Sequence, residues 1–315
     1  MAFYSQDPAL GNLLQANLQD LAQGRPGLGE QLSVTWLAYA SSPLDQAAGL
    51  DQADFWRLPL VGASHGGDRL RYPASVVKLF YGAALEAWLA RDLLLEGAEL
   101  RRALGDMLAD SSNDATSLVL DLLTGSTSGP ELPEGPFQAW TRQRQLVNDW
   151  FDGLGWPEWQ GCNACQKTWA EGPYGRERQF YGADRSNRNR LSTDATARLL
   201  HGLIAGAWVS PPASARLRAP LSRCLDPLAR AADPENQVDG FLGGSLPKGS
   251  RLWSKAGWMS QARHDAAYLE VPGSRPFLLV AFSEGESLAK DEDLLPELCQ
   301  RLAGAIANSP AVEIP

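Results

Sequence analysis

The stretch "RYPASVVKLF", residues 71–80, places a serine and a lysine three residues apart at the point where an apolar run begins. Residues 75–94 are rich in alanine and leucine, which predicts a buried helix. Because three residues make almost one helical turn, the side chains of Ser75 and Lys78 would share one face of that helix. A serine hydroxyl is a poor nucleophile unless a neighbouring base takes its proton, and burial makes a lysine lose its proton readily. The stretch therefore predicts a nucleophile and its base.

The same pair has a second interpretation, a helix cap beside a lysine that extends toward solvent. A Ser-x-x-Lys spacing is expected about once by chance in a chain of this length. Two further segments bear on the choice. "ADSSNDATSLVLDLL", residues 109–123, places a Ser-Ser-Asn triplet (111–113) just before a predicted helix, and "LWSKAGWMS", residues 252–260, places a Lys-Ala-Gly triplet (255–257) inside a predicted strand.

In this order the three segments resemble the S-x-x-K, S-D-N and K-T-G signatures of the penicillin-recognising serine hydrolases, which include the class A β-lactamases and the penicillin-binding transpeptidases. The flanking sequences are similar too, so the resemblance covers nearly the whole chain and is strongest over residues 72–123 and 191–284. It implies an α/β (α+β) fold of the β-lactamase/transpeptidase type. It also implies a serine hydrolase that works through an acyl-enzyme.

The order of the predicted elements agrees with such a fold. Periodicity predicts helices over residues 8–21, 75–94, 96–108, 114–123, 137–154, 193–205 and 294–307. It predicts strands over residues 32–40, 54–60, 251–259, 264–271 and 276–283. Strands near both chain ends must meet to form one antiparallel sheet, so the helical middle is an insertion.

We therefore expect a single catalytic domain over residues 1–315. Residues 1–72 and 245–315 would form its sheet subdomain, and residues 73–244 an inserted all-helical subdomain. Residues 158–191 are irregular in composition. Because unstructured segments of this length are uncommon inside compact domains, this loop is a candidate functional segment.

The resemblance assigns catalytic roles to four residues. Ser75 would be acylated, and Lys78 would activate it. Ser111 would relay a proton to the leaving nitrogen or oxygen. Lys255 would attract a substrate carboxylate and hold the local potential positive.

The resemblance also assigns substrate contacts. Asn113 would hold the substrate amide and the lysine. The backbone N–H groups of Ser75 and Trp258 would form an oxyanion hole, which contributes several kcal/mol in acyl transfer. Gly257 would let the substrate approach the strand closely, since a side chain there would block it.

The chain departs from the family pattern at three points. Ser112 stands where the family usually has Asp, and Ala256 replaces a Thr or Ser whose hydroxyl helps to bind a substrate carboxylate. Class A β-lactamases also carry a loop glutamate that drives water onto the acyl-enzyme, whereas "YGADRSNRNRLST" contains no Glu. The nearest acids are Asp184 and Glu177. Each is either a water-activating acid placed by a remodelled loop or an ordinary surface or arginine-paired carboxylate.

The composition excludes several classes of partner. The net charge of −9 repels phosphate backbones and anionic lipid, so we expect no nucleic-acid or membrane partner. The N-terminus lacks a basic start and an unbroken apolar segment, and no stretch is long enough to span a bilayer. We therefore expect a cytoplasmic protein that acts on a small-molecule or peptide-like substrate. The oligomeric state stays open.

Cys162 and Cys165 form a C-x-x-C pair. Zinc would need two more ligands, and Cys224 and His201 do not form a second close pair. The βαβ setting of a redox motif is absent. We therefore expect no metal and no cofactor, although a zinc-stabilised structural domain is a separate hypothesis.

His65 and the neighbours His264 and Asp265 raise the alternative of a Ser–His–Asp triad. No G-x-S-x-G nucleophile elbow is present, and no nucleophile lies near these residues in the predicted order of elements. The His264–Asp265 pair instead resembles the start of the family strand that follows the third signature.

Two functional hypotheses follow. The first is a class A β-lactamase-like serine hydrolase that acts on a β-lactam, an ester or a peptide-like amide. The alternative is a penicillin-binding sensor or pseudo-enzyme, which becomes acylated but turns over inefficiently because the usual loop glutamate is missing.

Overall fold

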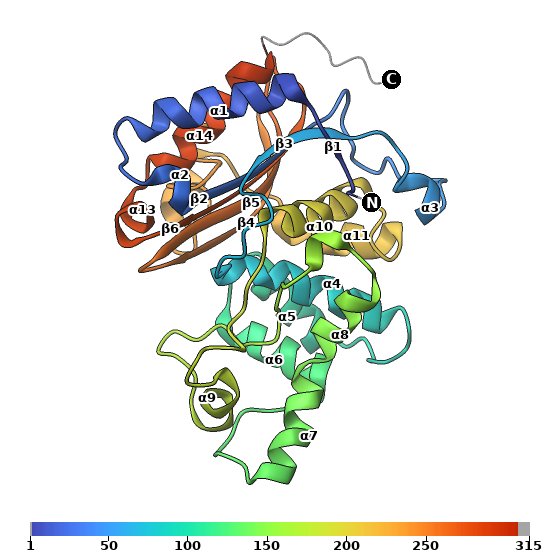
Figure 1. The fold of residues 1–315 in the computed structure, drawn as a ribbon. Helices are drawn as coiled ribbons and strands as arrows, with labels where there is room; N and C mark the ends of the chain where they lie inside the picture. The colour runs from blue at the N-terminus through green and yellow to red at the C-terminus, as the bar shows by residue number, and fades with distance from the viewer. Residues whose placement is uncertain (1, 308–315) are drawn as a thin grey trace.

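A six-stranded sheet lies at the centre of the computed structural model, which describes residues 2–307 (Figure 1). The strands are β1 (Ser5–Gln6), β2 (Leu32–Ala38), β3 (Val61–His65), β4 (Arg251–Met259), β5 (Ala262–Glu270) and β6 (Phe277–Glu284). Their spatial order is β1-β3-β2-β6-β5-β4. β1 is parallel to β3, and the other neighbouring pairs are antiparallel. Strands from the two parts of the chain therefore meet in one sheet, which confirms the predicted fold class.

Helices cover both faces of this sheet. α1 (Pro8–Ala22) and α14 (Leu294–Ala307) pack on one face, and α10 (Thr193–Ala205) packs on the other (Figure 1). Because strand side chains alternate between the two faces, Val34 and Trp36 of β2 join the core beneath α1 and α14. Thr35, between them, donates a hydrogen bond to Thr193 of α10 at 2.8 Å.

Local capping sets the ends of these helices. α1 begins at Pro8, after Asp7 accepts a hydrogen bond from the Leu10 N–H at 2.8 Å. α10 begins after Ser192 caps the Ala195 N–H at 3.0 Å and ends at Gly206, whose φ is 82°. The predicted bounds of α10 and α14 are confirmed, and α1 extends one residue beyond its prediction.

The helices α4 to α9 form a block beside the sheet (Figure 1). α4 runs through this block, and each of its residues up to Trp88 is buried. The helices of the block are α4 (Lys78–Leu89), α5 (Ala98–Leu108), α6 (Asn113–Thr124), α7 (Glu134–Arg144), α8 (Leu146–Gly153) and α9 (Gly175–Tyr181). The shorter elements elsewhere are α2 (Leu28–Gln31), α3 (Gln52–Phe55), α11 (Pro211–Arg218), α12 (Pro227–Ala232), α13 (Glu286–Lys290) and the 3-10 turns η1 (Ala74–Val77), η2 (Pro157–Trp159) and η3 (Ala219–Leu221).

The structure corrects the predicted strand over residues 54–60. This stretch contains the end of α3, which starts after Asp51 caps the Asp54 N–H at 2.7 Å. The strand β3 follows only at Val61, where it can pair in register with β2. A single helix predicted over residues 137–154 is also wrong, because it is divided into α7 and α8 at Gln145.

The predicted helical insertion contributes to the sheet layer as well. α10 lies inside residues 73–244, yet it packs directly on β2, β5 and β6. The division of the chain into two subdomains stays a prediction.

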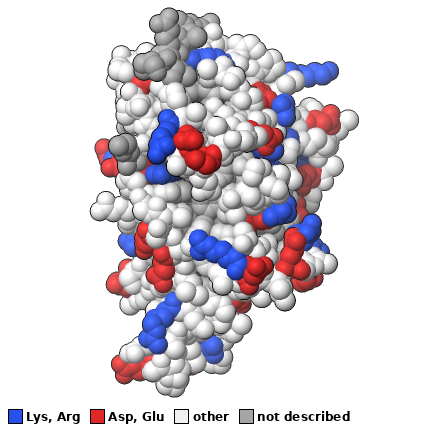
Figure 2. All heavy atoms as spheres, turned by 90° about the vertical axis from the view of Figure 1, so that its right-hand side faces the viewer, with Lys and Arg blue, Asp and Glu red and all other residues white. Residues whose placement is uncertain are grey.

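Charged side chains of both signs are interspersed on the face of the molecule drawn in Figure 2. Among residues 2–307, no helix combines the length and the hydrophobicity that a bilayer-spanning segment needs.

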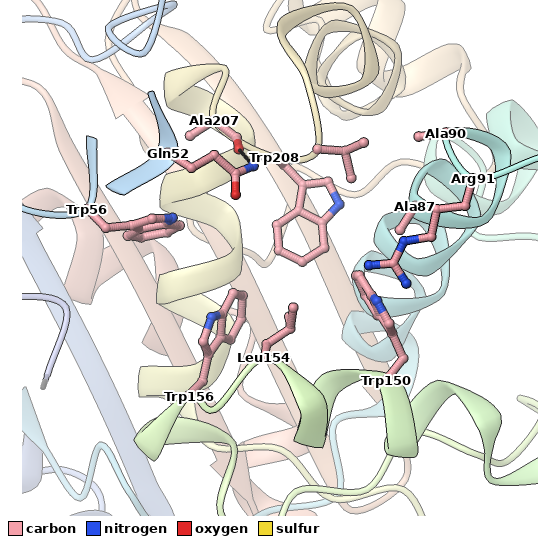
Figure 3. A pocket seen from close by; sticks show the side chains of 11 residues that line it. Gln52, Trp56, Ala87, Ala90, Arg91, Trp150, Leu154, Trp156, Ala207 and Trp208 are labelled. Atoms are coloured by element: carbon pink, nitrogen blue, oxygen red, sulfur yellow. Dashed lines mark hydrogen bonds between the residues drawn. The ribbon is translucent and has the colours of Figure 1, made fainter. Parts of the chain in front are cut away.

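A tryptophan-lined cavity of about 270 Å³ lies where α10, α8 and α4 come together (Figure 3). Trp56 and Trp156 lie on one side of Trp208 in this view, and Trp150 and Arg91 lie on the other. The described residues that line the cavity include no carboxylate and no serine, cysteine or histidine. The cavity therefore lacks nucleophilic and acidic side chains, whereas Ser75 and Ser111 line a different cleft.

Candidate active site

That cleft has a volume of about 450 Å³ and lies between the edge strand β4 and the helical block. Ser75 enters it from η1, and Ser111 and Asn113 enter it from the turn between α5 and α6 and from the first residue of α6. Gly257 and Trp258 line it from β4. Three segments that are far apart in the sequence thus meet in one cleft, and these five residues line it.

Backbone packing holds the Ser75 segment against β4. A Cβ atom on Gly257 would lie 2.9 Å from the Ser75 nitrogen and 2.9 Å from the Pro73 carbonyl oxygen. Gly257 therefore lets the two backbones approach each other. This packing within the protein explains the glycine without the close substrate approach that the family resemblance implies. Ala74, directly before Ser75, has a φ of 45°, which is a strained value for a residue with a side chain.

Two side chains tie the backbone before Ser75 to the sheet. His264 donates from Nε2 to the Tyr72 carbonyl oxygen at 2.8 Å, while its Nδ1 accepts from the Ser283 N–H at 3.0 Å. Glu284 accepts from the Tyr72 N–H at 3.2 Å. Burial lowers the pKa of His264 to about 4, so its ring stays neutral at physiological pH. His264 therefore has a structural role here, and it is not the base of a triad.

Lys78 is fully buried at the start of α4. Its Nζ donates to Asn113 Oδ1 at 2.9 Å, to Ser111 Oγ at 3.1 Å and to the Ser111 carbonyl oxygen. Among the hydrogen bonds of residues 2–307, none joins Lys78 to the Ser75 hydroxyl. Burial lowers the pKa of Lys78 to about 7, and the Glu235 carboxylate opposes this shift. A substantial fraction of the amine is therefore neutral at pH 7 and able to accept a proton.

The rate at which Ser75 is acylated is expected to rise about tenfold per pH unit at acidic pH and to level off above about pH 7, where Lys78 is neutral. A chromogenic ester in stopped-flow experiments across this range measures the profile. Lys78→Arg is the matched control, because arginine keeps the positive charge but does not lose its proton. A wild-type rate that stays constant across neutral pH would contradict the assignment of Lys78 as the base.

Ser111 connects the two lysines. Its Oγ accepts from Lys78 at 3.1 Å and from Lys255 at 2.9 Å. Ser111 has a φ of 61°, so the turn between α5 and α6 aims its side chain at this point. Since both lysines donate to this oxygen, its own hydrogen remains available to donate into the cleft.

Lys255 is fully buried on β4 and makes two further hydrogen bonds. Its Nζ donates to Gln237 Oε1 at 2.6 Å and to the Ala256 carbonyl oxygen at 2.8 Å. Burial, followed by the charges of Lys78 and Arg223, holds the pKa of Lys255 well below its ordinary value. Gln237 is a site residue that sequence reasoning missed, because nothing in the loop "DPENQVDG" indicates that it folds over β4.

The other predicted substrate contacts also lie at the cleft. Asn113 lines it and accepts a hydrogen bond from Lys78. Trp258 has 59% of its surface exposed, and its indole N–H donates to the Ala289 carbonyl oxygen at 3.0 Å. β4 lies at the edge of the sheet, so alternate backbone groups on its outer side have no strand partner. Ser112 caps α6 by accepting from the Ala115 N–H at 3.1 Å, a task that an Asp also performs well.

Glu177, by contrast, lies outside the residues that line the cleft. Its buried carboxylate pairs with Arg144 at 2.5 Å and accepts from Ser128 at 2.9 Å. Lys167 approaches it at 3.9 Å. The structure thus places Glu177 in a buried ion-pair cluster, and Asp184 is an exposed residue that caps the Ser186 N–H at 3.1 Å.

The cysteine pair is not arranged as a metal site. Burial raises the pKa of Cys162 to about 11 and that of Cys165 to about 12, so both are protonated thiols. Cys165 packs with Trp140 and Phe180. Within residues 2–307, no group of three or more His, Cys, Asp or Glu side chains is placed to hold a metal ion.

Comparison with solved structures shows a shared fold. A β-lactamase from Xanthomonas campestris matches with a TM-score of 0.59 and 17% identity, over 94% of this chain and 98% of its own. A β-lactamase from Sphaerobacter thermophilus matches with a TM-score of 0.59 and 18% identity, over 95% and 98%. A mutant of PBP-A, solved as an acyl-enzyme complex with penicillin G, matches with a TM-score of 0.62 and 16% identity, over 94% and 96%.

Sequence comparison gives a family match but no individual relative. No curated protein matches the chain. The sequence model of the Beta-lactamase enzyme family matches residues 94–309, which is more than half of the chain and begins after the Ser75–Lys78 segment. The chain therefore belongs to the β-lactamase enzyme family.

Proposed function

We propose that the protein is a serine hydrolase that forms an acyl-enzyme on Ser75. One observation carries this proposal: a continuous hydrogen-bonded array of Asn113, Lys78, Ser111 and Lys255 lies at the cleft that Ser75 enters. Such an array has no evident structural purpose, since burying two lysines without an acidic partner in contact costs stability.

The proposed reaction begins with Lys78 taking the proton of the Ser75 hydroxyl as its oxygen attacks the substrate carbonyl. The N–H groups of Ser75 and Trp258 stabilise the resulting oxyanion. Ser111 then donates its proton to the leaving nitrogen or oxygen and regains one from a lysine. The bond to the leaving group breaks, and an ester links the acyl group to Ser75. Water later hydrolyses this ester and returns the enzyme to its starting state.

The substrates we propose are esters, peptide-like amides and β-lactams, because each presents a carbonyl with a leaving group that Ser111 can protonate. The PBP-A mutant, which shares this fold, is named as an acyl-enzyme complex with penicillin G. That complex supports formation of an acyl-enzyme on this fold as the first chemical step.

A protein that is acylated but turns over slowly is the second candidate function. The buried ion pair between Glu177 and Arg144 favours it, because a carboxylate that is held at 2.5 Å by an arginine and does not line the cleft is not placed to direct water at Ser75. A penicillin-binding sensor would behave in this way.

Intact-mass spectrometry after exposure to a fluorescent penicillin and to a chromogenic phenyl ester tests both candidates. We expect an adduct on Ser75 from at least one of the two probes. An adduct that disappears as free enzyme is regenerated supports the hydrolase. An adduct that persists after the free probe is removed supports the sensor. The absence of any adduct on Ser75 would contradict acyl-enzyme chemistry altogether.

A further inference from the structure

Lys255 has no free N–H donor for a negatively charged substrate group in the cleft. An ammonium group has three donors and no acceptor. All three on Lys255 are used, by Ser111 Oγ at 2.9 Å, Gln237 Oε1 at 2.6 Å and the Ala256 carbonyl oxygen at 2.8 Å. Ala256 itself contributes no hydroxyl. The residue that the family resemblance would give to a substrate carboxylate is therefore already satisfied within the protein.

The arginines around the cleft are engaged as well. Arg263 pairs with Glu292 at 3.3 Å and donates to the Gly240 and Ala289 carbonyl oxygens at 3.2 and 2.9 Å. Arg223 donates to the carbonyl oxygens of Ala109 and Ser254, each at 2.8 Å. Neither guanidinium is free to receive a carboxylate.

One acidic side chain at the cleft, in contrast to these cationic residues, is not engaged by any partner within residues 2–307. Glu235 lines the cleft with Ser75, Ser111 and Asn113, and it is exposed. Asp239 and Glu292, which also line the cleft, are paired with Arg230 and Arg263.

The Glu235 carboxylate, by contrast, has no hydrogen bond or ion pair among residues 2–307. Its backbone is nevertheless fixed, since the Glu235 N–H donates to Asp233 at 2.9 Å.

The field of Glu235 reaches the catalytic lysines. Glu235 lines the same cleft as Asn113 and Ser111, which accept hydrogen bonds from Lys78 and Lys255. Its carboxylate acts to raise the pKa of both lysines. A negative charge on the wall of this cleft opposes the attraction that Lys255 would exert on a substrate carboxylate. A carboxylate that enters the cleft would meet a like charge and no free donor, whereas an ammonium group would meet an unpaired carboxylate.

We propose that Glu235 is a specificity-determining residue that makes the cleft prefer acyl donors with a neutral or positively charged leaving group and reject those with a carboxylate. This inference rests on the proposed acyl-enzyme chemistry at Ser75. Within the proposed substrates it favours neutral or amine-bearing esters and amides, and it ranks penicillins, which carry a carboxylate, below them as acyl donors.

A matched series of three phenylacetyl esters tests this preference. Their leaving groups are 3-hydroxybenzoate, 3-hydroxybenzamide and 3-(aminomethyl)phenol, which differ in charge but have similar shapes. Glu235→Gln is expected to raise kcat/KM for the anionic ester relative to the neutral one by about tenfold, and to lower that of the cationic ester by a similar factor. Glu131→Gln is the control, because it removes the same charge from an exposed position outside the cleft.

All three esters form the same phenylacetyl-enzyme, so the rate of its hydrolysis is common to the series. Unchanged ratios in Glu235→Gln, with all three esters still acylating Ser75, would overturn the inference but leave the proposed function intact. If Glu235→Gln hydrolyses the common acyl-enzyme more slowly but leaves the kcat/KM ratios among the esters unchanged, the specificity role is overturned. Glu235 would then have a water-activating role. Failure of every ester to label Ser75 would remove the proposed function, and this inference with it.

Discussion

Ser75→Ala is expected to abolish formation of the acyl-enzyme, with a loss of about 10⁴-fold or more in the rate of ester cleavage. The Ser75 side chain is half-buried, and among residues 2–307 its hydroxyl makes no hydrogen bond. Removing that hydroxyl therefore takes away the nucleophile but little packing. Intact-mass spectrometry and ester kinetics measure the loss, and thermal unfolding shows whether the variant is folded.

Ser112→Ala is the matched control for that experiment. Its hydroxyl caps α6, so its removal is expected to cost about 1 kcal/mol of stability, while the adduct still forms on Ser75. Lys78→Ala is expected to lose acylation as Ser75→Ala does, because the hydroxyl then lacks its base. A Ser75→Ala protein that is still acylated by the same probes would refute the nucleophile assignment.

Gly257→Ala is expected to reduce acylation by about 10²-fold, since a displacement of about 1 Å at a reacting group has an effect of this size. The new Cβ would lie 2.9 Å from the Ser75 nitrogen, 2.9 Å from the Pro73 oxygen and 3.1 Å from the Val76 nitrogen. These are backbone atoms, so β4 and η1 must move apart. Overpacking of this kind also costs about 1–3 kcal/mol of stability. Acylation kinetics and chemical denaturation of the variant measure the two effects.

Gly11→Ala provides the same chemical change in open space. A Cβ on Gly11 meets nothing within 4 Å, and Gly11 lies inside α1, so the substitution is expected to stabilise the protein by up to about 1 kcal/mol. Its acylation rate should equal that of the wild type. A Gly257→Ala variant with normal acylation would show that the close approach of β4 and η1 does not position Ser75.

Where the sequence-based predictions failed, a tertiary contact overrode a local pattern. A strand with a proline suited to a sheet edge is predicted over residues 54–60, but α3 ends there, and pairing with β2 begins only at Val61. Glu177 lies in a stretch that is predicted to be irregular but contains α9, and only the folded chain brings it to Arg144. Gln237 and Glu235 lie in a loop without periodicity, so no pattern in their own segment points to Lys255.

The sequence by itself determined the elements that depend on neighbouring residues. The leucine spacing of α1 and the pattern of the strand residues from 251 onward predict a helix and strands near their observed positions, because side-chain periodicity acts within a few residues. The three short signatures also identified Ser75, Lys78, Ser111 and Lys255 as candidates.

Only the tertiary structure decided what those residues contact. Ser111 bridges two lysines from distant segments, Gly257 brings β4 against the Ser75 backbone, and Gln237 takes a donor of Lys255. Hydrogen bonds and electrostatic fields depend on distance in space, and segments more than a hundred residues apart come within a few ångströms of one another only when the whole sheet has formed.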